Sequence, residues 1–75
     1  MAENISATVN YGNGYVYAFL NDGLYLRADA KTGVLSDGYP KTTSSKWPGV
    51  TDTQAKQIVA AVNDGNGKVY LFYQG

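Results

Sequence analysis

Cysteine and histidine are both absent from this chain of 75 residues. Disulfides and Cys/His zinc sites, which stabilise many small domains, are therefore excluded. A hydrophobic core of this size is only marginally stable by itself. We therefore expect tight packing or a partner chain to supply the remaining stability.

Charge and long apolar runs are also scarce. Six Lys and Arg balance six Asp and Glu, and they form no basic cluster of the kind that nucleic-acid binding needs. The longest apolar runs are only a few residues long, too short to cross a bilayer. The start Met-Ala-Glu-Asn has neither a basic region nor an apolar region, so we expect no signal peptide. These features indicate neither nucleic acid nor membrane as a partner, and they leave the localisation open.

The motifs of catalysis and metal binding are missing too. No Ser-His or Cys-His pair can form, and the six acidic residues are scattered, mostly in turns. The segment 63–67 is similar to the middle of a calcium loop, but its register puts Val62 and Tyr73 at the first and last ligand positions. The Gly-x-Gly pairs lack the third glycine and the helix of a phosphate loop. We therefore expect no enzyme, and we assign no catalytic residue, cofactor or certain metal ligand.

An internal repeat is the strongest signal in the sequence. The segment 5–22 matches the segment 58–75 at ten of eighteen positions, at an offset of 53 residues. Composition alone would give about one match. A period near 50 residues is typical of a propeller blade, which has four antiparallel strands. One blade cannot bury a core alone, so we expect it to need neighbouring blades.

Alternating apolar residues predict strands at 5–10, 15–20 and 24–28. Asn13-Gly14 predicts a type I′ turn between the first two strands, because both residues tolerate positive φ. A weaker fourth strand is expected at 34–36, and one helical turn at 40–45, before Trp47-Pro48-Gly49. The pattern predicts a mainly β fold, with an antiparallel four-stranded sheet and a short helical turn.

The segment 51–62 permits two interpretations. Its propensities favour a helix with Asp52 as a cap, whereas the repeat predicts a loop or short turn at 51–57 and a strand at 58–63. We adopt the strand and keep the helix as the alternative. A further strand at 69–73 then closes a second hairpin.

Short motifs follow one another along the chain, and the first two kinds then begin again. They are Ile5-Ser6-Ala7, Val16-Tyr17-Ala18-Phe19, Tyr25-Leu26-Arg27, Gly38-Tyr39-Pro40-Lys41 and Trp47-Pro48-Gly49, followed again by Ile58-Val59-Ala60-Ala61 and Val69-Tyr70-Leu71-Phe72. In this order, the motifs resemble the hemopexin-like repeat, a four-stranded propeller blade. The resemblance implies an N-terminal lead at 1–4, a complete blade at 5–50, a linker at 51–57 and the first two strands of a second blade at 58–75.

The resemblance also implies a central channel lined by inner-strand carbonyls that could hold a cation or an anion. The candidate channel residues are Ser6, Ala7, Val59 and Ala60. Ser6 and Val59 stand where the family has Asp, and losing a charged oxygen lowers the affinity for a hard cation. The heme carrier of the family needs histidine ligands, so histidine-ligated heme is excluded here.

The remaining candidate residues are apolar or aromatic. Tyrosine and tryptophan side chains form both sugar-stacking platforms and interface hot spots. Tyr11, Tyr15, Tyr39 and Trp47 are the surface candidates for a ligand or interface role, and packing within the blade is the alternative role for each of them. We expect the blade-packing residues to be Val16, Tyr17, Phe19, Leu24, Leu26, Val69, Tyr70 and Phe72.

Two functions are consistent with these residues. The first is a self-assembly module, in which the hairpin 58–75 pairs with or replaces the equivalent strands of another copy, so that several chains close a β-propeller. The second is a small lectin-like or ion-binding propeller, which uses its surface aromatics or its channel. Because Met1 directly precedes the first repeat, we expect a chain complete as made, an engineered or truncated propeller piece.

Overall fold

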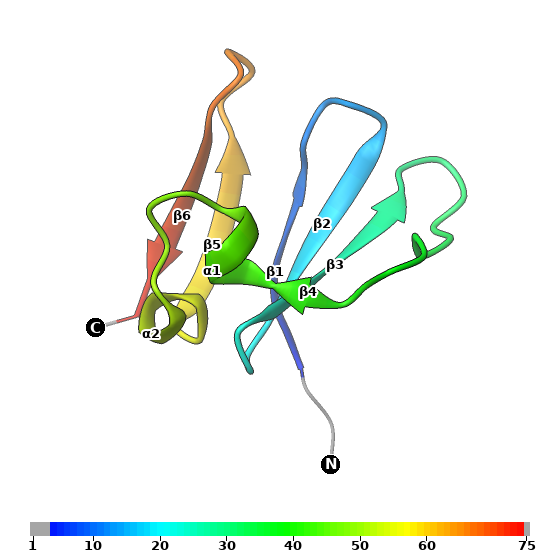
Figure 1. Ribbon diagram of the computed structural model, residues 1–75. Helices are drawn as coiled ribbons and strands as arrows, with labels where there is room; N and C mark the ends of the chain where they lie inside the picture. The colour runs from blue at the N-terminus through cyan, green and yellow to red at the C-terminus, as the bar shows by residue number, and fades with distance from the viewer. Residues whose placement is uncertain (1–3, 75) are drawn as a thin grey trace.

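The structure is a computed structural model that describes residues 4–74, so residues 1–3 of the expected lead and Gly75 lie outside the described residues. Figure 1 shows a larger sheet on one side of the molecule and a two-stranded hairpin on the other. The elements in chain order are β1 (Ile5–Asn10), β2 (Tyr15–Leu20), β3 (Leu24–Asp29), β4 (Lys41–Thr42), α1 (Thr43–Lys46), α2 (Asp52–Ala55), β5 (Ile58–Asn63) and β6 (Val69–Tyr73).

The larger sheet has four antiparallel strands in the order β1-β2-β3-β4. Its first three strands confirm the predicted ranges, and β3 runs one residue further than expected. The predicted fourth strand is wrong. Residues 34–36 make only one bridge to β3, between Leu35 and Ala28, while Lys41–Thr42 forms β4. The segment 34–36 leaves β3 after Ser36 because the chain turns at Asp37-Gly38, where Gly38 has a φ of 86°.

The β1–β2 turn also differs from the prediction. A type I′ turn needs positive φ at both central residues, but only Gly12 and Gly14 have positive φ in this loop. The connection is a longer loop closed by a hydrogen bond from the Tyr11 N–H to the Tyr15 carbonyl. Glycine tolerates positive φ at little cost, so the two glycines take the positions with positive φ and Asn13 has a negative φ.

Both helices are single turns. The helical turn expected at 40–45 begins three residues later, at Thr43, because Lys41 and Thr42 pair with Tyr25 and Leu24 as β4. α2 begins after Thr51, whose side chain accepts a hydrogen bond from the Gln54 N–H in a capping box. The helix stops at Ala55, so the longer helix alternative for 51–62 is wrong and the strand at 58–63 is confirmed.

The β5–β6 hairpin repeats the β1–β2 hairpin in its pairing as well as its sequence. Each pair is antiparallel and has a register shift near its start, between Ile5 and Ala7 in β1 and between Ile58 and Ala60 in β5. A β-bulge of this kind places one extra residue in one strand, here Ser6 or Val59. The two hairpins therefore share the same β-bulge as well as the same sequence pattern.

The core lies between the two sheets. β1 and β5 lie next to each other (Figure 1), and Ile58, Ala61, Val69 and Leu71 of the hairpin pack in or against the buried cluster of the larger sheet. Phe19 and Ile58 are the most deeply buried large apolar residues, with exposed fractions of 0% and 1%. The fold is thus mainly β, as expected. In residues 4–74, no helix combines the length and the apolar character needed to cross a membrane.

Candidate functional site

The four-stranded sheet has two chemically different faces. Strand alternation puts Tyr17 and Phe19 of β2 on the face that contacts the hairpin, together with Val9 of β1 and Tyr25 of β3. We call this the packed sheet face. The opposite side, which we call the open sheet face, carries no charged side chain from β1, β2 or β3, and it consists of Ile5, Thr8, Asn10, Val16, Ala18, Leu20, Leu24, Leu26 and Ala28.

The hairpin is divided in the same way. Ile58, Ala61, Val69 and Leu71 form the packed hairpin face, which contacts the four-stranded sheet. The open hairpin face, which points away from the core, consists of Ala60, Val62, Tyr70 and Phe72.

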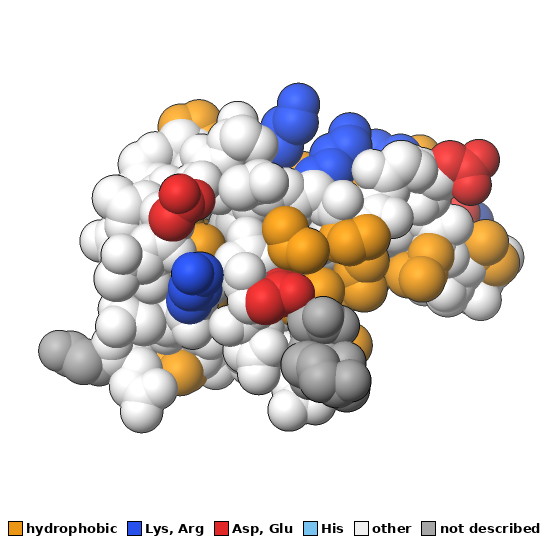
Figure 2. Space-filling view, turned by 60° about the horizontal axis from the view of Figure 1, so that its bottom comes forward, with side chains coloured by type: hydrophobic (Ala, Val, Ile, Leu, Met, Phe, Trp, Pro, Cys, Tyr) orange, Lys and Arg blue, Asp and Glu red, His pale blue; other side chains and the backbone are white. Residues whose placement is uncertain are grey.

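Much of the apolar surface stays in contact with solvent. Phe72 is 53% exposed and Tyr70 is 48% exposed on the open hairpin face, while Ile5 is 59% exposed on the open sheet face. Figure 2 shows a larger group of hydrophobic side chains at the centre and right of the view, with smaller hydrophobic areas elsewhere on the same face. Contiguous apolar patches on a small protein usually mark an interaction site.

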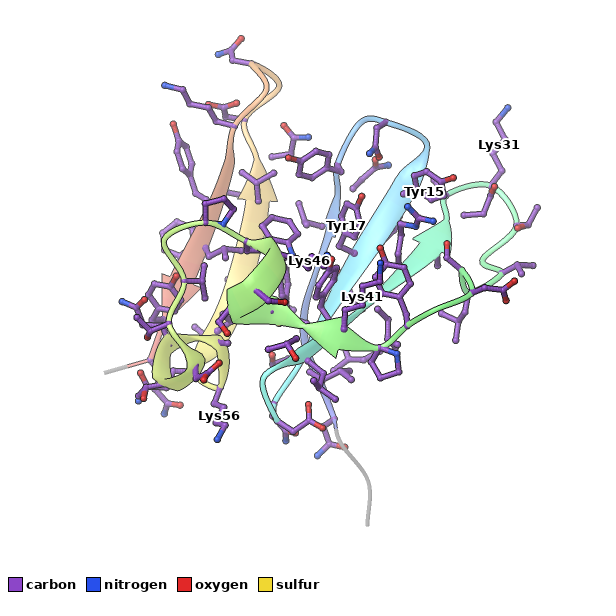
Figure 3. The ribbon with its side chains drawn as sticks, in the orientation of Figure 1. Tyr15, Tyr17, Lys31, Lys41, Lys46 and Lys56 are labelled. Carbon is purple, nitrogen blue, oxygen red and sulfur yellow. The ribbon has the colours of Figure 1, made fainter. Side chains whose placement is uncertain are left out.

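A cluster of aromatic rings surrounds Trp47. The ring centroids of Tyr11, Tyr17, Phe19 and Tyr25 lie 5.0–5.9 Å from that of Trp47, at angles of 65–87°. Edge-on contacts of this kind are favourable for aromatic pairs. Beside the cluster is an open pocket of about 190 Å³, lined by Tyr11, Tyr17, Tyr25, Lys46, Trp47 and Pro48. Figure 3 shows that Tyr17 comes from β2 and Lys46 from α1.

Arg27 occupies a second aromatic environment, near the outer edge of the sheet. Its guanidinium carbon lies 4.2 Å from the ring centroid of Tyr15 and 5.2 Å from that of Tyr39. Its Nε donates a hydrogen bond to the Ser36 hydroxyl at 2.9 Å. The hydrogen bond to Ser36 links Arg27 to the segment 34–36, and the cation–π contacts with the two tyrosine rings keep the guanidinium in position for it.

Tyr25 has the most perturbed ionisation in the site. Burial, together with a side-chain hydrogen bond with Tyr39, raises the pKa of Tyr25 to about 12. The tyrosine stays protonated at neutral pH, and its ring packs edge-on against Tyr39 with centroids 5.4 Å apart. It therefore acts as a polar but uncharged part of the core.

The predicted channel residues lie on the two neighbouring strands β1 and β5. The Ser6 hydroxyl donates a hydrogen bond to the Phe19 carbonyl, and Val59 is exposed. Ala7 packs against the core, and Ala60 lies on the open hairpin face. One Asn links the strands directly, because the Asn63 Nδ2 donates to the Asn10 carbonyl at 3.1 Å.

Two aspartates accept hydrogen bonds from backbone N–H groups within turns. Asp29 accepts hydrogen bonds from the N–H groups of Lys31 and Thr32, and these bonds lower its pKa. Asp64 accepts one from the N–H of Asn66, which lowers its pKa in the same way. Within residues 4–74, no three metal-ligating side chains lie close enough together to hold an ion.

The structure separates the predicted aromatic candidates into two groups. Tyr11 and Trp47 meet at the Trp47 pocket, while Tyr15 and Tyr39 flank Arg27. The predicted packing residues also divide: Tyr17 and Phe19 lie on the packed sheet face, Val69 on the packed hairpin face, Val16, Leu24 and Leu26 on the open sheet face, and Tyr70 and Phe72 on the open hairpin face.

Sequence reasoning did not single out Ile58, Tyr25, Arg27 or the Asn10–Asn63 pair as site residues. The repeat could have indicated the asparagines, since both follow a Val at equivalent positions. Comparisons with protein-family models and with curated proteins both find no match to this chain.

Proposed function

We propose that this chain is a non-enzymatic assembly module, a hemopexin-like propeller fragment that associates with copies of itself into a closed β-propeller. The observation that carries the proposal is the pair of uncharged apolar faces, one on each side of the molecule. Like the packed sheet face and the packed hairpin face, these two open faces consist mainly of apolar side chains from alternate positions of the strands.

Energetics favour association over a solitary chain. Apolar surface gains about 25 cal/mol for each Å² removed from water. The monomer leaves Ile5, Tyr70 and Phe72 roughly half exposed, so their burial is still to be gained. A second chain can provide that burial. On the open sheet face the gain comes mainly from Ile5 and the partly exposed residues, since Leu20 is already buried.

The blade assignment rests on sequence order and on the four-stranded sheet. The motifs of the hemopexin-like repeat occur in the family's order, and residues 5–50 contain all four strands of one antiparallel sheet. The segment 58–74 then forms the start of a second sheet rather than extending the first. This arrangement suits one blade followed by half of another.

Light scattering coupled to size exclusion, at micromolar concentrations, tests the proposal. We expect the native chain to have a mass that is a multiple of the 8.1 kDa of one copy. A Phe72→Glu variant should shift the mass toward one chain, because a charge on the open hairpin face resists burial. The matched control is Asn66→Glu, which adds the same charge at the exposed hairpin tip and should leave the assembly intact. A folded native monomer would overturn the proposal.

The Trp47 pocket favours a second function, a lectin-like binding protein. Its lining combines tyrosine and tryptophan rings with a lysine, which is a chemistry that suits a sugar ring and its hydroxyls. A glycan array and calorimetric titrations with monosaccharides and Ca²⁺ test this function. Binding that is lost in Trp47→Ala and kept in Tyr73→Ala would support this function. If no glycan, monosaccharide or Ca²⁺ binds, the lectin-like function is wrong.

A further inference from the structure

The residues on the two open faces repeat the residues of the internal interface. At the offset of 53 residues, Val62, Tyr70 and Phe72 of the open hairpin face correspond to Val9, Tyr17 and Phe19 of the packed sheet face. All three pairs are identical in residue type. The open hairpin face therefore repeats the β1 and β2 part of the packed sheet face, whereas Tyr25 of β3 has no counterpart in the hairpin.

The complementary surface is repeated as well. Ile58 and Val69 of the packed hairpin face correspond to Ile5 and Val16 of the open sheet face, again with identical residue types. Leu71 corresponds to Ala18, which is smaller but still apolar. Each chain thus contains one interface between its sheet and its hairpin. It also carries, on its two open faces, the two surfaces that could form a similar interface with another copy.

We propose, resting on the self-assembly function above, that a second copy of this chain docks head to tail, with its open sheet face on the open hairpin face of the first. The intermolecular contact then reproduces the internal one: Ile5 and Val16 of one copy cover Tyr70 and Phe72 of the other. A contact between two different faces repeats from copy to copy, and it closes a ring when the rotation between copies allows.

Face packing explains the structure better than strand replacement. β5 and β6 pair with each other, and Ile58 of β5 already belongs to the same buried cluster as Phe19. If the hairpin moved into another copy's sheet to replace β1 and β2, it would uncover that core. Docking on the open faces buries new surface and leaves the existing core intact.

A hydrogen bond specifies the register of the proposed contact. Within the chain, the Asn63 Oδ1 accepts from the Gly65 N–H, and the Nδ2 of the same side chain donates to the Asn10 carbonyl of the neighbouring inner strand. Asn10 has the same local arrangement, since its Oδ1 accepts from the Gly12 N–H at 2.9 Å. Asn10 also lies on the open sheet face, as its pairing with Val16 requires. Its Nδ2 should therefore donate to the Asn63 carbonyl of the second copy.

Two complementary variants test the head-to-tail contact. The first, Tyr70→Glu with Phe72→Glu, blocks the open hairpin face; the second, Ile5→Glu with Ala18→Glu, blocks the open sheet face. Each alone should lose assembly, because every contact would involve one blocked face. Their equimolar mixture keeps one intact face of each kind, so we expect a one-to-one pair at twice the mass of one chain, and nothing larger.

Native mass spectrometry with one variant isotope-labelled reads the outcome. A mixed pair supports the head-to-tail contact, even if each variant alone is unfolded, because mixing then restores the complex. Assembly of the native chain without a mixed pair overturns this contact and leaves self-assembly standing. A monomeric native chain overturns both proposals.

Asn10→Asp provides a second measurement. The substitution keeps the acceptor for the Gly12 N–H but removes the proposed intermolecular donor. We expect about a tenfold increase in the dissociation constant of the assembly, the size of effect that a lost hydrogen bond gives. An unchanged dissociation constant would overturn the proposed role of Asn10.

Discussion

Thr43 is buried in an unusual way for a polar residue. Its side chain is fully buried at the start of α1, and among residues 4–74 its hydroxyl has no hydrogen-bond partner. Its backbone is well satisfied, because its N–H donates to the Gly23 carbonyl and its carbonyl accepts from the Trp47 N–H. The cost of this position is therefore confined to one oxygen atom.

A Thr43→Val substitution should stabilise the fold by about 1 kcal/mol, since it keeps the side-chain shape and removes an unpaired buried hydroxyl. Urea unfolding at a fixed protein concentration measures the change. Thr43→Ser, which keeps the hydroxyl and loses the methyl group, should instead destabilise by about 1 kcal/mol. A Val variant that unfolds at lower urea than the native chain would contradict the argument.

The raised pKa of Tyr25 predicts a loss of stability in alkali. The folded chain holds the Tyr25 proton up to about pH 12, whereas an unfolded tyrosine releases it near the ordinary tyrosine pKa of 10.0. Because the unfolded state binds fewer protons in that range, the free energy of unfolding falls as the pH rises from 10 towards 12.

Denaturant unfolding at a series of alkaline pH values, on the native chain and on Tyr25→Phe, measures this effect. The variant has no proton to lose at this position, so its stability should fall less steeply between pH 10 and 12. Equal slopes for the two proteins would show that Tyr25 does not cause the alkaline loss.

At the scale of elements, α2 is specified by its cap rather than by its length. A four-residue helix is far too short to be stable in isolation. Thr51 and Gln54 form a reciprocal capping box, in which the Gln54 side chain also accepts from the Thr51 N–H at 3.1 Å. The box provides hydrogen-bond partners for two backbone N–H groups at the start of α2, which precedes β5 in the chain.

Thr51→Ala should destabilise the fold by about 1 kcal/mol, the usual cost of losing an N-cap side chain. Thr51→Ser keeps the acceptor oxygen and should cost only a few tenths of that amount. Thermal unfolding monitored by circular dichroism compares the three proteins. Equal losses for Ala and Ser would indicate that the methyl group, and not the cap, carries the effect.

At the scale of the whole molecule, stability and association are coupled under the proposed function. Anything that binds the folded state stabilises it by mass action, and here the ligand is another copy. The thermal midpoint should therefore rise by roughly 5–10 °C over a hundredfold increase in protein concentration.

Differential scanning fluorimetry across that concentration range measures the midpoint. The variant with Tyr70→Glu and Phe72→Glu is the control, and its midpoint should not depend on concentration. A constant midpoint for the native chain, at concentrations where scattering shows only one species, would contradict coupling between folding and assembly.

Local chemistry was enough to predict most strands. Alternating residues in 5–10 and 15–20, and the repeat in 58–63, determine where the strands lie, because strand geometry places every second residue on one face. The same alternation puts Val16 and Ala18 on the opposite face of β2 from Tyr17 and Phe19. No partner strand was needed for that inference.

Tertiary structure decided the rest. The fourth strand is at 41–42 and not at 34–36, because residues 41–42 pair with the start of β3. The helix α1 begins directly after this strand. The site depends on contacts of the same long-range kind: Trp47 meets Tyr11 across 36 positions of sequence, and Asn63 reaches Asn10 across 53. The repeat in the sequence is enough to predict two equivalent hairpins. Which of their faces are buried and which remain open follows from the packing of one sheet on the other, because burial depends on how whole sheets meet in space.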